Sequence, residues 1–171
     1  MGRQIATYIL LIVLLLLAQV LICNHILLFG IAMPVIFIYV IIRLPMSMSM
    51  PTVLSIAFFY GAIVDIFSDT AGVNAFSCTI IAMLRKPVYS LYIGHDSDMA
   101  DLTPTMATIG VFKYIKYMLT LVVIYFIVSY SLIYFSFLHI TDIAGRIFSS
   151  AGITALLLTG IDSLIIDRRD R

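Results

Sequence analysis

The chain has 171 residues, of which 63% are hydrophobic and 11% are charged, and its mean hydropathy is +1.14. Soluble domains carry about a quarter charged residues, so this composition excludes water as the main solvent of the chain. Ten basic and nine acidic residues give a net charge of +1, which excludes a strongly basic nucleic-acid-binding protein and makes the positions of the charges more informative than their sum.

The first apolar run extends from Ile5 to Ile42 and is too long for a single transmembrane helix. At about 1.5 Å per residue it would reach roughly 57 Å, whereas the hydrocarbon core of a bilayer is about 30 Å thick. The polar pair Asn24-His25 predicts a turn inside this run. We therefore expect a first span over residues 5–23 and a second over residues 26–42, in which Pro34 introduces a kink.

The next two spans are separated by a short acidic turn. Residues 45–51, rich in Met, Ser and Pro, predict a loop, and residues 52–67 predict a third span. A fourth span over residues 71–84 is short for a bilayer, but Arg85 and Lys86 at its end can extend to the membrane interface. Residues 85–105 predict the longest polar loop.

A fifth span over residues 106–137 and a sixth over residues 143–166 complete the chain, followed by a charged tail. The six spans predict one transmembrane domain, an all-α integral membrane protein folded as a compact bundle. Basic residues in short loops favour the cytoplasm. With the N-terminus inside, six spans place every basic residue except Arg146 on or near the cytoplasmic side, so we expect both termini to be cytoplasmic.

Asp65 lies near the outer end of the third predicted span. A carboxylate at membrane depth is costly, so it usually faces protein or a water-filled cavity. Two interpretations are open: a carboxylate that contacts a partner or lines an ion pathway, and a hydrogen-bonding group that fixes helix packing or caps the span.

Asp162 lies within two helical turns of the cytoplasmic end of the sixth predicted span, and Lys113 and Lys116 lie near the cytoplasmic end of the fifth. A charge left unpaired at mid-membrane costs roughly 2.5 to 3.5 kcal/mol. We therefore predict an intramembrane ion pair between Asp162 and one of these lysines. Small residues in the sixth span permit close approach of a helix from the same chain or from another protein; they are Gly145, Ser149, Ala151, Gly152, Ala155 and Thr159.

The sequence predicts no catalytic, cofactor-binding or metal site. It contains no Glu, and His25, His95 and His139 fall in different parts of the predicted topology. We find no glycine-rich phosphate loop, no Cys/His metal spacing and no nucleophile elbow. We therefore expect a protein that is not an enzyme.

Motifs around the third and fourth spans resemble those of the rod shape-determining MreD family. The chain has Leu44-Pro45 before the third span, a Gly-x-x-x-Asp pattern at its end, a Gly-x-x-Ala pattern at the start of the fourth, and Arg85 closing it. Its length and six-span layout are also similar to those of the family. Ala62 stands where the family usually has Leu, and Asn74 where a His is common, so no role of that His carries over to this chain.

The resemblance implies a non-catalytic scaffold of the bacterial cell-elongation complex in the inner membrane. Its partners would be an MreC-like membrane protein, an MreB-like cytoskeletal protein, and the glycosyltransferase and transpeptidase that build the lateral wall. Four motif residues would shape the outer corner between the third and fourth spans, where an MreC or synthase helix could dock: Gly61, Asp65, Gly72 and Ala75.

Two other classes of function remain open. The layout is also similar to that of the substrate-binding components of energy-coupling-factor vitamin importers, which would make this chain a small-molecule-binding subunit. Those proteins typically have Ala-x-x-x-Ala in their first helix, and residues 5–23 lack that motif. An ion-coupled carrier using Asp65 and Asp162 is the third class, for which the spans provide few other acidic residues.

Overall fold

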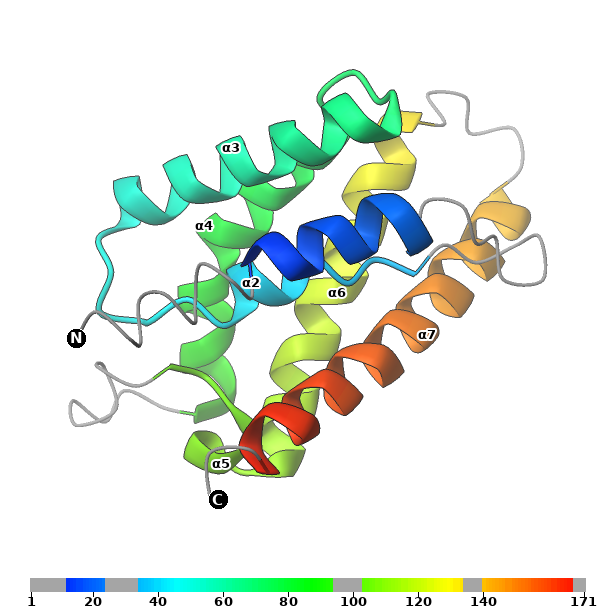
Figure 1. The fold of residues 1–171 in the computed structure, drawn as a ribbon. Coiled ribbons are helices and arrows are strands. Elements are labelled where there is room, and N and C mark those ends of the chain that lie inside the picture. The colour runs from blue at the N-terminus through cyan, green and yellow to red at the C-terminus, as the bar shows by residue number, and fades with distance from the viewer. Residues whose placement is uncertain (1–11, 24–33, 94–102, 134–139, 168–171) are drawn as a thin grey trace.

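The computed structural model describes residues 12–23, 34–93, 103–133 and 140–167 (Figure 1). The regular elements among these residues are all helices, which confirms the predicted all-α class. An N-terminal helix, described over Ile12–Leu21, runs into the π-helical turn η1 (Gln19–Cys23). The other elements are α2 (Ile38–Ile42), α3 (Met50–Ser68), α4 (Val73–Ile93), α5 (Met106–Ile109), α6 (Val111–Ile133) and α7 (Ile140–Asp167).

The long helices pack in sequence order around a short central one. α3 and α4 form a hairpin, α4 packs on α6, and α6 packs on α7. α2 contacts both α4 and α6 and lies between α3 and α7 in the view of Figure 1. All five residues of α2 are buried, so this short helix forms part of the core of the bundle.

The predicted second span departs from a regular helix. Of its described residues, only Ile38–Ile42 are assigned to α2, and residues 34–36 have no regular structure; residues 26–33 lie outside the described part. Pro34 lacks a backbone N–H and so cannot donate a helical hydrogen bond at the start of this irregular segment. Side chains replace the missing helical bonds: Gln19 accepts from the Ile36 N–H at 2.8 Å and donates to the Pro34 carbonyl at 3.2 Å, and Thr154 accepts from the Val35 N–H at 3.1 Å.

The other helices differ from the predicted spans mainly at their ends. α3 and α7 lie close to residues 52–67 and 143–166, and the described part of residues 5–23 is helical. α4 continues to Ile93 through Pro87, so Arg85 and Lys86 belong to a helix rather than to the predicted loop. Residues 106–137 form two helices in their described part, because Gly110, at a φ of 83°, separates α5 from α6.

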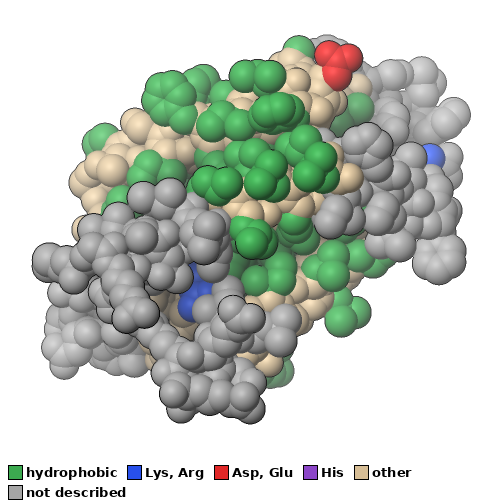
Figure 2. Space-filling model, in the orientation of Figure 1, with side chains coloured by type: hydrophobic (Ala, Val, Ile, Leu, Met, Phe, Trp, Pro, Cys, Tyr) green, Lys and Arg blue, Asp and Glu red, His purple; other side chains and the backbone are tan. Residues whose placement is uncertain are grey.

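Among the described residues, many large apolar side chains are exposed, and several polar side chains are buried within the apolar core. By length and composition, α3 and α6 could each cross a membrane, and most of each helix is not buried inside the protein. Figure 2 shows apolar side chains spread over the face that contains α3. The buried polar residues of the described part are Gln19, Arg43, Asp65, Ser77, Arg85, Thr105, Ser129, Ser150, Thr154 and Asp162. Soluble proteins usually show the opposite arrangement of charged residues, which they rarely bury.

Candidate functional site

The turn from α3 into α4 is built around the buried carboxylate of Asp65. Its Oδ1 accepts hydrogen bonds from the Thr70 hydroxyl at 2.5 Å and from both the backbone and side-chain nitrogens of Asn74 at 3.0 Å. Its Oδ2 accepts from the Ala75 N–H at 2.8 Å. Asp65 therefore caps the N-terminus of α4, where free amides and the helix dipole favour a negative charge.

Gly61 lets α3 and α4 touch through their backbones. A Cβ at Gly61 would lie 2.6 Å from the Ala75 Cα and 2.7 Å from the Asn74 carbonyl oxygen, closer than non-bonded atoms approach. The turn itself contains Gly72 at a φ of 82° and Asp69 at a φ of 52°. The structure thus brings the four predicted motif residues Gly61, Asp65, Gly72 and Ala75 together in what we call the α3–α4 corner. Their role as a partner interface stays a prediction.

Asn74 connects the α3–α4 corner to α6. Its side-chain oxygen accepts a hydrogen bond from the Tyr125 hydroxyl, and its side-chain nitrogen donates to Asp65 and to Thr70. One turn further, Ser129 of α6 donates to Ser77 of α4 at 2.9 Å. Sequence reasoning singled out Asn74 only as a departure from the family pattern and missed Tyr125, because nothing in the sequence places α6 beside this turn.

A groove runs along the outward face of the α3–α4 hairpin and reaches the α3–α4 corner. Its volume is about 820 Å³. The large side chains that line it, Phe58, Ile66 and Phe76, are exposed. Between them lie small residues, including Ala62 and the buried Ala75. An apolar groove with small residues between large ones fits the side chains of another apolar helix.

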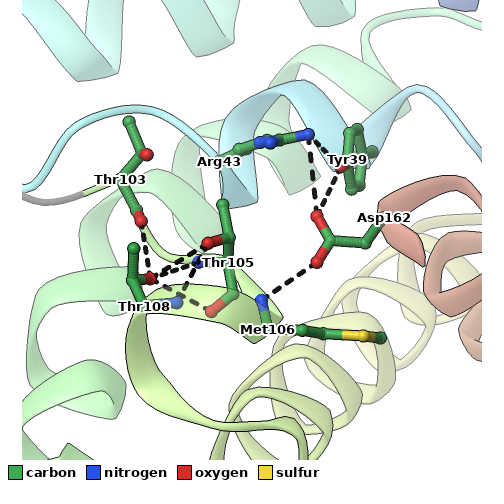
Figure 3. Close-up of polar contacts among 7 residues, drawn as sticks. All are labelled: Tyr39, Arg43, Thr103, Thr105, Met106, Thr108 and Asp162. Atoms are coloured by element: carbon green, nitrogen blue, oxygen red, sulfur yellow. Dashed lines mark hydrogen bonds and ion pairs between the residues drawn. The ribbon is translucent and has the colours of Figure 1, made fainter. Parts of the chain in front are cut away.

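A second polar cluster, the Asp162 junction, joins α2, α5 and α7 (Figure 3). The Oδ1 of the fully buried Asp162 accepts from the Tyr39 hydroxyl at 2.6 Å and lies 3.6 Å from the Arg43 guanidinium, which also donates to Tyr39. Its Oδ2 accepts from the backbone N–H of Met106, the first residue of α5, at 3.0 Å. Both carboxylate oxygens are therefore occupied by groups from other helices.

The partner of Asp162 differs from the predicted lysines. Among the described residues the ion pair is Arg43–Asp162. Tyr114 and Tyr117 face the core of the bundle, so Lys113 and Lys116 lie on the opposite, exposed face of α6. Lys116 lies over the ring of Phe112, 4.4 Å from its centroid. The prediction failed because hydropathy does not show that α2 lies at the centre of the bundle, where it places Arg43 next to Asp162 of α7.

Arg85 joins the two ends of the sequence motif. Its fully buried guanidinium donates to the carbonyls of Ile41 at 3.2 Å, Leu44 at 2.8 Å and Pro45 at 2.6 Å. These carbonyls belong to the end of α2 and the turn after it, where free carbonyl groups favour a cation. Arg85 therefore fastens the Leu44-Pro45 turn to α4, forty residues away in the sequence.

The fold and these contacts define an all-helical bundle with an apolar surface and two buried polar clusters. Comparisons of the chain with known protein families, with curated proteins and with solved structures give no match. No group of three or more His, Cys, Asp or Glu side chains that could hold a metal ion occurs in the described part of the chain. The carboxylates of Asp65 and Asp162 are fully engaged in contacts that hold helices together.

Proposed function

We propose that this chain is a multi-pass protein of the bacterial inner membrane that acts as a non-catalytic scaffold in the cell-elongation complex, as MreD-like proteins do. One observation carries the proposal. The residues of the MreD-like motif, spread from Leu44 to Arg85, make direct contacts with one another, and four of them form the α3–α4 corner. Contacts between the motif residues support the resemblance to MreD-like proteins more strongly than the sequence match does by itself.

The distribution of side chains supports the membrane part of the proposal. α3 has 19 residues, or about 28 Å of helix, close to the thickness of the hydrocarbon core. Its exposed residues include Phe59, Ile63 and Ile66, which would be unfavourable in water. Residues 34–36, which lack helical bonds, are buried and hydrogen-bonded by side chains, as irregular backbone at membrane depth must be.

In this proposal the groove beside the α3–α4 corner receives a transmembrane helix of an MreC-like protein or of a wall-synthesis enzyme. The groove has the apolar lining and small residues that close helix packing in a bilayer requires. The hydrogen-bonded turn at Asp65 fixes the relative position of α3 and α4, and so fixes the shape of the groove. A rigid, preformed surface lowers the entropic cost of binding.

Affinity purification from native membranes in mild detergent tests the proposal, with co-purifying proteins identified by mass spectrometry. We expect an MreC-like protein and wall-synthesis enzymes to co-purify with the native chain, and their yield to fall at least fivefold with Ile66→Ala. Leu156→Ala is the matched control, because Leu156 lies on α7 outside the groove and is 76% exposed against 78% for Ile66. Recovery of the energising module of a transporter instead would overturn the proposal, as would equal losses with both variants.

A further inference from the structure

A second hollow opens on the inner side of the α3–α4 corner and shares Asp69 and Thr70 with the groove on the outward face. We call it the end cavity; its volume is about 350 Å³. It is lined by Gln19 of η1, by Val35 and Phe37 before α2, by the end of α3, by the start of α4 and by α6. Binding sites for small molecules usually have volumes of about 300–1,000 Å³ and are mostly apolar with a few polar groups. The scaffold proposed above makes no use of this cavity.

Two irregular pieces of backbone border the end cavity. Gln19 is the first residue of the π-helical turn, and Val35 lies in the segment without helical bonds. Single π-helical turns are uncommon and occur often at functional sites. Gln19 joins the two pieces, because its side-chain amide bonds both the Pro34 carbonyl and the Ile36 N–H. Gln19 therefore holds these two lining segments together.

The charges around the end cavity favour a cation. Asp69, an exposed residue that also lines the groove, is the one charged residue of its lining, and no Lys or Arg of the described chain lines it. α3 ends here at Ser68, and the carbonyl end of a helix carries a partial negative charge. The positive end of α4 also lies here, but Asp65 already binds its amides at Asn74 and Ala75. Because the Phe76 N–H is bonded to Gly72, an anion would meet Asp69 with only the Val73 N–H left as a donor from the first turn of α4.

Aromatic rings form one wall of the end cavity. Tyr125 packs edge-on against Phe37 and Phe126, with ring centroids 6.0 and 5.4 Å apart, and Phe126 stacks on Tyr130 at 6.0 Å. These rings all line the cavity. Aromatic faces bind organic cations, more strongly where water is excluded. The polar side chains of Asn74, Tyr125 and Ser129 are already bonded within the protein, so the rest of the ligand must be largely apolar.

We propose that the end cavity binds a small organic cation with a flat apolar body, with the cationic group beside Asp69 and the body against the aromatic wall. The absence of Trp from the chain provides a direct assay, since the indole emission of tryptamine is then free of protein background under selective excitation. The full chain would be placed in vesicles of zwitterionic phosphatidylcholine, with protein-free vesicles as the blank. Fluorescence anisotropy would report binding of tryptamine and of the anionic indole-3-propionate.

We expect saturable binding of one tryptamine per chain and at least tenfold weaker binding of indole-3-propionate. Asp69→Asn should weaken tryptamine binding about tenfold, and the turn should persist because Asn tolerates the left-handed conformation of Asp69. Val73→Phe, which fills the cavity, should abolish binding, whereas Val111→Phe, outside it, should not. No saturable binding of tryptamine, equal binding of both indoles, or unchanged binding by Asp69→Asn would overturn the inference.

Discussion

The two buried acids of this chain are held in different ways. Asp65 is bound by amides and a hydroxyl at a helix N-terminus, whereas Asp162 has a guanidinium, a phenol and one amide as partners. In both arrangements each carboxylate oxygen accepts at least one hydrogen bond. Both acids could be recognised in the sequence as residues that need partners, because charge at membrane depth is costly. Their partners could not be recognised, because Arg43 and Asn74 are brought to them by the tertiary path of the chain.

Replacing Asp162 should be strongly destabilising, because Arg43 would be left buried without its counter-charge. We expect Asp162→Asn to lower the free energy of unfolding by about 3–5 kcal/mol. Unfolding in mixed micelles, followed by circular dichroism, measures this change. Lys116→Ala is the control and should change it by less than about 0.5 kcal/mol. Equal effects of the two substitutions would contradict the assignment of the ion pair to Arg43.

At the scale of helices, the long apolar runs predicted most helices well. The helices that differ from prediction, α2 and α4, do so where side chains hydrogen-bond to the backbone of distant segments. α3 and α7 lie close to their predicted ranges because each forms over one long, mainly apolar run of residues. α2 is short because side chains from η1 and α7 satisfy the backbone before it. Arg85 was expected to lie at the membrane interface, at the end of the fourth span. The carbonyls of Leu44 and Pro45 bind its guanidinium inside the protein instead, so α4 can continue past it.

The contact between α3 and α4 can be tested at Gly61. Gly61→Ala would place a Cβ 2.6 Å from the Ala75 Cα, so the two helices must separate. We expect a loss of about 1–3 kcal/mol in the free energy of unfolding. Gly152 of α7 is the matched control, since nothing lies within 4 Å of an added Cβ, and Gly152→Ala should raise stability by about 0.5–1 kcal/mol. Destabilisation of equal size at both glycines would contradict the close helix contact.

At the scale of the whole molecule, the described residues form an apolar core in which a few polar clusters are buried, and many large apolar side chains are exposed on the surface. Composition alone predicted a membrane environment, and the structure adds where the polar groups go: into the α3–α4 corner and the Asp162 junction. The end cavity could not be predicted, since its lining joins segments as far apart as Gln19 and Ile133. The groove lies within residues 58–79, and its shape depends on the close contact of α3 and α4 at Gly61. In the topology proposed above, α3 crosses the bilayer, with its start in the cytoplasm and the α3–α4 corner outside.

The crossing of α3 can be measured by labelling single cysteines at its two ends. Ser47 and Ala71 are both exposed, so Ser47→Cys and Ala71→Cys are suitable labelling sites. Each would be made separately in a chain that carries Cys23→Ala and Cys78→Ala. Spheroplasts would be treated with a membrane-impermeant maleimide, before and after lysis. We expect Ala71→Cys to react in intact spheroplasts and Ser47→Cys to react only after lysis. Reaction of both positions only after lysis, or of both before it, would show that α3 does not cross the membrane and would contradict the account.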